Sequence, residues 1–396
     1  MNMNEQMKES EENILHTYNR FPVVFEKGQG CYLYDSEGKE YLDFAAGIAV
    51  NSLGYHYPGY DEALKDQIDK LMHISNLYYN EPIIEAGAKL VKASKMSKAF
   101  FTNSGTEAIE GALKAAKKYA YVRDGHADHE IIAMNHSFHG RSIGALSVTG
   151  TAHYREPFEP LMGGVKFADF NDLESVKAQI TDKTCAIITE VVQGEGGIYP
   201  AKREFLEGLR QICDEKDIML IFDEIQCGMG RTGYYFAWQA YGVQPDIMTS
   251  AKALGCGVPV GAFVLSEKAA KASLEPGDHG TTYGGNPFVC AAVSKVFEIY
   301  ENDKIIEHVQ EMTPYLEQKL DEIVAKHECA ATRRGMGFMQ GIVIQGCPVG
   351  EVVKAALAKG LLVISAGSDV LRIVPPLVIT KEHIDKMASI LDECME

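Results

Sequence analysis

The stretch AKREFLEGLRQICDEKDIMLIFDE, residues 201–224, joins one helical segment to one buried strand and decides the fold class. Its first half carries apolar residues at the spacing of one helix face: Phe205, Leu206, Leu209 and Ile212. Its second half contains IMLIF (218–222), an uninterrupted apolar run typical of a parallel strand that is buried on both faces. A helix that leads directly into such a strand indicates an α/β layer, because helices cover the faces of parallel sheets.

The same alternation continues on both sides of this unit. We expect four further buried parallel strands: EIIAM (130–134), CAIITEVV (185–192), DIMTSA (246–251) and GAFVLS (261–266). Together they predict a large α/β domain over about residues 60–285, with a mostly parallel central sheet flanked by helices.

The two ends of the chain predict a second, smaller domain. Residues 31–44 alternate on either side of a Gly-containing turn and indicate a hairpin. The C-terminal part shows a helical stretch over about 288–326 and strands near 338–344 and 371–374. We therefore assign residues 1–59 and 286–396 to a smaller α+β domain.

Composition and charge narrow the classes of partner. The chain has 396 residues, and its 38 Lys and Arg residues face 55 Asp and Glu residues, which gives a formal net charge of −17. Such an acidic surface repels phosphate backbones and anionic lipid, so we expect neither a nucleic acid nor a membrane as partner. An anionic ligand must instead find a local positive site.

Cysteine usage and the N-terminal stretch indicate the compartment. The nine cysteines are scattered and form no C-x-x-C pair, which argues against a disulfide framework and a zinc site. The stretch MNMNEQMKESEENILHTYNR is polar and acidic, so it does not resemble a signal peptide. No apolar run reaches the roughly 18 residues of a transmembrane helix. We expect a cytoplasmic protein.

Carboxylates and one lysine follow three of the predicted strands, where open parallel sheets bind their ligands. Glu190 and Glu195 follow one strand. Asp223 and Glu224 end the next, and Lys252 follows the one after. Each alone has an ordinary explanation, because an acid can cap a turn and a lysine can end a helix. Together they predict one site at this edge of the sheet.

Ser104, Gly105 and Thr106 precede a predicted helix and indicate an anion site. Small residues at a helix N-terminus leave backbone N–H groups and hydroxyls free to hold a phosphate. The alternative is an ordinary N-cap, which Ser or Thr also supplies. No G-K-[ST] sequence follows, so a nucleoside triphosphate loop is excluded.

Two further motifs are ambiguous. GMGRTG (228–233) matches G-x-G-x-x-G, but it does not directly follow the strand, so we reject a dinucleotide site and expect a flexible loop. In NHSFHG, His136 and His139 have no third ligand at suitable spacing, so we expect no metal. Phe138 can instead supply an aromatic platform, and Arg141 a fork for a carboxylate.

A phosphate seat, an aromatic platform, a strand-end aspartate and a lysine among small residues are the parts of a pyridoxal-phosphate site. In this order they resemble the class III, or ornithine-type, aminotransferases of fold type I. The resemblance extends over nearly the whole chain, through YLDFAAGIAVNSLG (41–54), SNLYYNEP (75–82), FFTNSGTEAIEGALKAA (100–116), NHSFHGRS (135–142), QGEGG (193–197), IFDEIQCGMGRTG (221–233), AKALGCGVPVGA (251–262), HGTTYGGNP (279–287) and RIVPPL (372–377).

The resemblance implies a role for each of these residues. Lys252 attaches pyridoxal 5'-phosphate covalently and moves a proton between the substrate carbon and the cofactor. Asp223 pairs with the pyridine nitrogen, and Gln226 with the ring hydroxyl oxygen, while Phe138 stacks on the ring. Thr282 reaches the phosphate of the neighbouring subunit, which implies a homodimer with shared sites. Further cofactor contacts are implied for Ser104, Gly105, Thr106, His139, Glu190 and Thr281.

The resemblance also implies the substrates. Arg141 binds the α-carboxylate of the amino donor, Arg372 binds that of 2-oxoglutarate, and Glu195 masks the second arginine in one half-reaction. Ile48 stands where ornithine-specific members tend to have a tyrosine for the free α-amino group. We therefore expect N2-acetylornithine as donor, in arginine biosynthesis. The alternatives are ornithine, succinylornithine, succinyl-diaminopimelate or 4-aminobutyrate as donor, or a non-catalytic scaffold, against which the retained Lys252 argues.

Overall fold

A seven-stranded sheet forms the centre of the larger part of the protein. The structure is a computed structural model that describes residues 2–396. Its strands lie in the order β4 (Lys98–Thr102), β12 (Gly261–Leu265), β11 (Ile247–Ser250), β10 (Met219–Asp223), β7 (Thr184–Glu190), β5 (Glu130–Met134) and β6 (Val165–Ala168). All run parallel except β12, which is antiparallel to both of its neighbours. The expected α/β fold with a mostly parallel central sheet is therefore confirmed.

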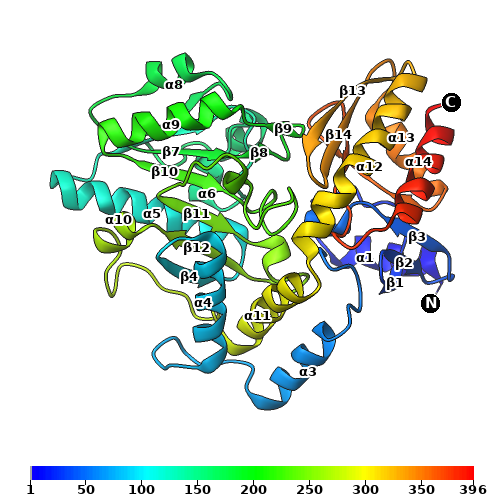
Figure 1. Cartoon of the computed structure of the whole chain (residues 1–396), viewed down its shortest axis with the longest axis horizontal. Coiled ribbons are helices and arrows are strands. Elements are labelled where there is room, and N and C mark those ends of the chain that lie inside the picture. Colours follow the sequence, from blue (N-terminus) through cyan, green and yellow to red (C-terminus); the bar gives the residue numbers. More distant parts are fainter. Residues whose placement is uncertain (1) are drawn as a thin grey trace.

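Alternating side chains along the buried strands explain the continuous apolar runs. Ile131 of β5 packs into the core formed with helix α5 (Gly105–Asp124), and its neighbour Ile132 packs on the opposite face. On that opposite face lies helix α9 (Arg203–Lys216), which contributes Phe205 and Leu209 to the core. Since successive residues of a strand point to opposite faces and both faces are covered, both residues must be apolar. Figure 1 shows the two helices with the sheet.

The expected parallel direction of GAFVLS is wrong, because β12 runs antiparallel to β11 and β4. Strand β11 ends at Ser250 and β12 begins at Gly261, and the segment between them holds only the short 3-10 turn η3 (Lys252–Leu254). A parallel neighbour needs a longer connection, usually an α-helix, so this short connection returns the chain antiparallel.

The edge strands β4 and β6 are not among the strands predicted from the sequence. Each carries a lysine, Lys98 at the start of β4 and Lys166 inside β6. Lysine on an edge strand is a usual protection against edge-to-edge pairing, and it interrupts the apolar pattern.

Three smaller sheets accompany the large one, and the first of them brings the two ends of the chain together. The first has the order β1 (Phe25–Gln29), β2 (Tyr32–Asp35), β3 (Glu40–Asp43) and β15 (Leu361–Leu362), so the expected N-terminal hairpin pairs with a C-terminal strand. The second has the order β13 (Ala330–Met336), β14 (Met339–Ile344), β17 (Val370–Ile373) and β16 (Ile364–Ala366). The third pairs β8 (Val192–Gln193) with β9 (Tyr199–Pro200). In Figure 1 the first two lie beside the large sheet, on the side of the molecule that holds both termini. The division into two domains stays a prediction that these sheets support.

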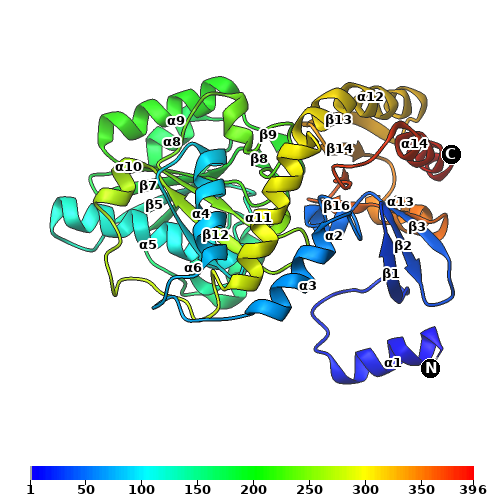
Figure 2. The same cartoon turned by 60° about the horizontal axis from the view of Figure 1, so that its bottom comes forward.

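The remaining helices complete the fold. Two long ones, α11 (Pro287–Asn302) and α12 (Ile305–Lys326), take the place of the single helical stretch expected near 288–326. The others are α1 (Met3–Asn13), α2 (Ala46–Ala49), α3 (Tyr60–Lys70), α4 (Glu81–Ser94), α6 (Ile143–Ser147), α7 (Ala152–Arg155), α8 (Leu173–Gln179), α10 (Glu267–Lys271), α13 (Val349–Ala358) and α14 (Lys381–Met395). Short 3-10 turns are η1 (Glu156–Phe158) and η2 (Ala237–Ala240). Figure 2 shows α1 standing apart from the rest, and none of its residues is buried. No helix within residues 2–396 has the length and apolar character needed to span a membrane.

Candidate active site

A cavity of about 500 Å³ opens at the carboxyl ends of the central strands. Strand register aligns Asp223 of β10 with Glu190 of β7 and with Thr249 of β11. Both carboxylates line the cavity together with Lys252, which follows β11. The structure thus brings together the strand-end groups that the sequence order puts at one edge. Of the residues singled out in the sequence, the following line the cavity: Ser104, Gly105, Thr106, Phe138, His139, Arg141, Glu190, Glu195, Asp223, Gln226 and Lys252.

Lys252 has a backbone and a side-chain environment unlike those of a surface lysine. Its φ of 48° is left-handed, a conformation that non-glycine residues adopt at a cost and that clusters at functional sites. The side chain reaches solvent only partly, and burial lowers the pKa of its ammonium group. The nearby Arg372 lowers this pKa further, while Glu195 opposes the shift. A lowered pKa increases the fraction of neutral amine, the form that acts as a nucleophile.

Asp223 is held in one orientation by three donors. The Ile225 N–H donates to Oδ1 at 3.0 Å, and the Thr249 hydroxyl donates to the same atom at 3.2 Å. The other oxygen, Oδ2, lies 2.7 Å from Nδ1 of the buried His139. Burial alone acts to lower the pKa of His139, but the hydrogen bond and charge of Asp223 outweigh it, so the pKa is raised. The pair therefore presents a fixed, partly compensated negative group to the cavity.

Glu190 lies at the same edge of the central sheet as Asp223, but it binds backbone N–H groups and its pKa is raised. Its carboxylate accepts hydrogen bonds from the N–H groups of Phe138 (3.3 Å) and Gly194 (3.1 Å). Burial raises the pKa of Glu190 to about 7, and the charge of Asp223 adds to this shift. Glu190 thus fixes the backbone that carries the aromatic residue Phe138.

The neighbouring acid, Glu224, turns away from the cavity. It is buried, and its two oxygens accept the N–H groups of Ala237 and Trp238, each at 2.8 Å. Of the two acids that end β10, Asp223 therefore faces the site. Glu224 instead holds the chain segment at Ala237 and Trp238, which is the ordinary structural role that an acid at a strand end can have.

The N-terminus of α5 supplies the candidate anion seat. The Ser104 hydroxyl accepts the Glu107 N–H at 3.3 Å, so Ser104 is an N-cap, as the alternative interpretation proposes. Within residues 2–396, the N–H groups of Gly105 and Thr106 have no hydrogen-bond partner. Unpaired N–H groups at a helix start attract anions, so one turn can be both a cap and an anion site.

Two arginines are in opposite states: Arg141 lines the cavity, whereas Arg372 lies behind Glu195 and Gln226, which line it. Arg372, only 2% exposed, donates to both oxygens of Glu195, with Nη2–Oε2 at 3.2 Å, and its Nη1 also lies 3.1 Å from Oε1 of Gln226. Burial alone acts to raise the pKa of Glu195, but Arg372 outweighs it and lowers that pKa below its ordinary value. Arg141 is exposed, and no carboxylate within residues 2–396 lies within 4.0 Å of its guanidinium. One carboxylate fork is therefore occupied and the other is free.

Thr281 and Thr282 do not line this cavity. Thr281 connects to it only through Asn103, whose Nδ2 donates to the threonine hydroxyl at 3.2 Å. Thr282 is exposed to solvent. Thr282 therefore makes no contact with the cavity of its own chain.

The two ambiguous motifs have clear structural roles. GMGRTG is buried rather than a flexible loop, because the Arg231 side chain is enclosed and its Nη1 donates to the Phe338 carbonyl at 3.2 Å. His136 is exposed, whereas His139 is buried against Asp223, so the two do not share a ligand.

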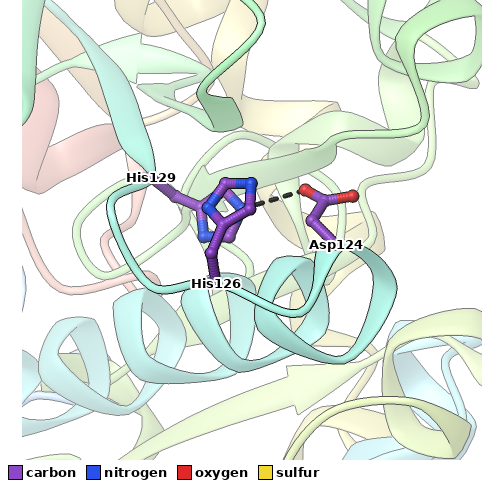
Figure 3. A group of neighbouring side chains, drawn as sticks. All are labelled: Asp124, His126 and His129. Carbon is purple, nitrogen blue, oxygen red and sulfur yellow. Dashed lines mark hydrogen bonds and ion pairs between the residues drawn. The ribbon is translucent and has the colours of Figure 1, made fainter.

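Figure 3 shows a different group of metal-ligating side chains at the end of α5: Asp124, His126 and His129. Arg123 forms an ion pair with the Asp124 carboxylate at 2.6 Å. The two imidazole rings are stacked, with centroids 4.5 Å apart. Because metals bind in the plane of an imidazole ring, two stacked rings cannot both direct a nitrogen at one ion without rotating.

Some features of the site are not evident from sequence motifs. A Cβ at Gly194 would lie 2.5 Å from Oε1 of Gln226, so only glycine allows this close approach. The Tyr154 ring lies against Arg141, and no motif marks it. Tyr154 is thirteen residues beyond Arg141 in the chain and becomes a neighbour only through the turn between α6 and α7.

Comparison with known proteins agrees with this geometry. The family model for aminotransferase class III matches residues 14–395. The chain belongs to the class III aminotransferases. Its relatives include the acetylornithine aminotransferases of Clostridium acetobutylicum (47% identical, covering 98% of this chain and 100% of that one) and of Methanocaldococcus jannaschii (48% identical, 96% and 95%). The crystal structure of the ornithine aminotransferase from Toxoplasma gondii superimposes on this aminotransferase with a TM-score of 0.95 at 28% identity, covering 100% of this chain and 95% of that one.

Proposed function

We propose that this aminotransferase transfers the 5-amino group of N2-acetylornithine to 2-oxoglutarate, giving N-acetylglutamate 5-semialdehyde and glutamate. The observation that carries the proposal is the cavity in which a desolvated lysine, Lys252, lies with the free Arg141 and with Glu195, which pairs with the buried Arg372. The names of the relatives at 47% and 48% identity support the choice of donor.

The residues of the cavity fit pyridoxal 5'-phosphate. The unpaired N–H groups of Gly105 and Thr106 suit its phosphate, and the fixed Asp223 carboxylate suits its pyridinium nitrogen. Phe138 suits the ring face and Gln226 the ring oxygen, while Lys252 suits its aldehyde carbon. When bound, this cofactor supplies the electron sink that lets a proton leave the carbon bearing the amino group.

The chain's own residues then hold and move the proton. The Lys252 amine is the base at the cavity, because its lowered pKa leaves it neutral more readily than an exposed lysine. Asp223 keeps a proton on the group that it faces, and His139 holds Asp223 in place at 2.7 Å. Glu190 and His139 complete the buried network behind Phe138.

The two arginines explain how one cavity accepts two carboxylate substrates. The free Arg141 binds the single carboxylate of N2-acetylornithine while Glu195 masks Arg372. When 2-oxoglutarate enters, its two carboxylates engage both arginines once Glu195 moves aside. Masking one arginine in this way prevents the donor from binding the wrong way round.

The choice among donors rests on few residues. Ile48 is 44% exposed and lines a neighbouring cavity that also reaches Arg372. Its apolar side chain cannot hydrogen-bond a free α-amino group, which favours an acylated donor. The shared fold with an ornithine aminotransferase keeps ornithine as the second candidate donor.

A homodimer is part of the proposal. The segment before α4 and the segment around Thr282 expose large apolar side chains, among them Leu77 (87% exposed), Tyr79 (95%) and Tyr283. The two segments are in contact, because Asn76 Nδ2 donates to the Gly284 carbonyl at 2.9 Å. Exposed apolar patches of this kind mark interfaces between chains. We place the enzyme in the cytoplasm because its nine cysteines are all free thiols.

A donor panel tests this function. Purified holoenzyme is mixed with N2-acetylornithine, ornithine, succinylornithine or 4-aminobutyrate, and the bleaching of the cofactor absorbance is followed. We expect kcat/KM for N2-acetylornithine to exceed the others by about tenfold or more, since an unpaired polar group of a poor donor is penalised. Lys252→Ala should show no bleaching, and borohydride should fix the cofactor only to the wild-type chain. A preference for one of the other three donors contradicts the donor assignment and leaves the class intact.

A further inference from the structure

The free guanidinium of Arg141 has no polar group that fixes its position. Within residues 2–396, no carboxylate lies within 4.0 Å of it and no side-chain hydrogen bond holds it. A long, exposed side chain without such contacts loses conformational freedom when it binds a ligand, which weakens binding.

Aromatic rings hold Arg141 instead. Its Cζ lies 3.8 Å from the centroid of the Tyr154 ring and 5.4 Å from that of Phe138. The two rings meet edge to face, with centroids 6.0 Å apart and planes at 83°. Stacking uses the flat face of a guanidinium and leaves its N–H edge free, which suits a group that must accept a carboxylate.

We propose that Tyr154 is a positioning residue for substrate binding: it holds Arg141 with its N–H edge open to the carboxylates of both substrates. The inference rests on the proposed function, in which Arg141 binds those carboxylates. Tyr154 does not line the cavity within residues 2–396, so we expect it to act through Arg141 and to set KM rather than kcat. The phenol oxygen is not needed, because the contact is made by the ring.

The test compares Tyr154→Leu with the conservative variant Tyr154→Phe in the holoenzyme. For Tyr154→Leu we expect KM for N2-acetylornithine and for 2-oxoglutarate to rise about tenfold with kcat nearly unchanged, the size of a cation–π contact. Calorimetric titration with glutarate, a non-reacting dicarboxylate, should show a similar loss of affinity. Tyr154→Phe keeps the ring and should restore both values. Tyr315→Leu removes a ring that lies over Lys319 outside the cavity, and it serves as the matched control.

A double-mutant cycle with Arg141→Ala separates this inference from the proposed function. If Tyr154 acts through Arg141, Tyr154→Leu has no further effect on KM or glutarate affinity once Arg141 is alanine. An equal effect in both backgrounds overturns the inference, and so does a Tyr154→Phe variant as poor as Tyr154→Leu. If Arg141→Ala alone leaves KM and glutarate affinity unchanged, the carboxylate role in the proposed function fails, and the inference falls with it.

Discussion

At the scale of single residues, the two arginines divide the work of recognising carboxylates. Arg372 is buried with its N–H groups on Glu195 and Gln226, whereas Arg141 lies on aromatic faces with its edge free. The resemblance implies that Glu195 masks Arg372, and the structure has this contact, whereas the aromatic neighbours of Arg141 are known only from the structure. The difference makes Glu195 the residue whose loss should affect the two half-reactions unequally.

Glu195→Ala tests this asymmetry. Without the carboxylate, Arg372 is always free, so N2-acetylornithine can bind in a second, unproductive orientation. We expect its half-reaction to slow by about tenfold, which corresponds to a preference of about 1.4 kcal/mol for the unproductive orientation, while the half-reaction with 2-oxoglutarate is largely retained. Single-turnover absorbance measurements with each substrate give the two rates. Glu195→Gln keeps the size of the side chain and removes its charge, so its half-reaction rates should lie between those of wild type and Glu195→Ala. Equal rates in wild type and Glu195→Ala would rule the masking role out.

The sequence predicts the position of the chemical groups better than their partners. Lys252, Asp223 and Glu190 can be located at one edge because strand ends of a parallel sheet meet there. Their contacts cannot be derived in the same way. His139 and Asp223 are 84 positions apart in the sequence, so their pairing has no local signal. Glu224 faces away from the cavity because its carboxylate accepts the N–H of Ala237, and the sequence does not show that Ala237 lies next to it.

At the scale of elements, the segment after β10 is held by Glu224. Its carboxylate takes the N–H groups at the start of η2, and this contact closes the buried loop that contains Gln226 and Arg231. A carboxylate with two acceptor oxygens is needed here, because each oxygen serves one N–H group. The loop that the sequence suggests to be flexible is therefore fixed.

Glu224→Gln should lower stability in a pH-dependent way. The amide loses one of the two acceptors, which costs about 1–3 kcal/mol. Burial raises the pKa of Glu224 from 4.5 to about 7. Because the folded-state pKa is the higher one, the stabilisation from proton binding is present at low pH and is lost as the pH rises through the folded-state pKa. The advantage of wild type over Glu224→Gln should thus be largest near pH 5 and shrink by about 3 kcal/mol or less by pH 8.

Urea unfolding of both holoenzymes at several pH values gives this difference. Glu311→Gln, the same change at an exposed position of α12, is the control and should show neither effect. A stability difference that stays constant across the pH range would contradict the assignment.

The sequence predicts the strands that are buried on both faces of the sheet. It does not predict the direction of a strand, because the length of the connection sets that direction. The strands β5 and β10 follow from largely apolar runs, and β7 and β11 follow from runs that also contain polar residues such as Thr189 and Ser250. The same kind of run at β12 says nothing about direction, since both directions are equally buried in the centre of a sheet. The direction is set by the short segment between Ser250 and Gly261, and the edge strands β4 and β6 lack the pattern because one side of each is unpaired.

At the scale of the whole molecule, the proposed division of the site between two chains depends on Thr282. It is exposed and outside its own chain's cavity, next to a patch of exposed aromatic side chains. A patch of this kind is stable in water when a second copy covers it. The shared-site dimer can therefore be tested by mixing defective subunits.

Lys252→Ala and Thr282→Glu should each be inactive as homodimers, the second because a carboxylate repels the cofactor phosphate. If each site takes its lysine from one chain and Thr282 from the other, a hybrid dimer contains one intact site. Random mixing then restores about a quarter of wild-type activity. Refolding the two variants together and measuring turnover gives the answer. No recovery, with hybrid dimers demonstrated by differently tagged chains, would show that each chain uses its own Thr282.

The enclosed Arg231 ties together parts of the chain that are distant in sequence. From the loop after β10 it donates to the carbonyls of Phe338 and Pro375, and its own carbonyl accepts the Phe338 N–H at 2.8 Å. The hydrogen bond of Arg231 to Pro375 links the segment after the strand that ends at Asp223 to the segment after the strand that carries Arg372. The proposed alternation between the two substrates then rests on movement of the Glu195 side chain away from Arg372, because the strand that carries Arg372 is held in place.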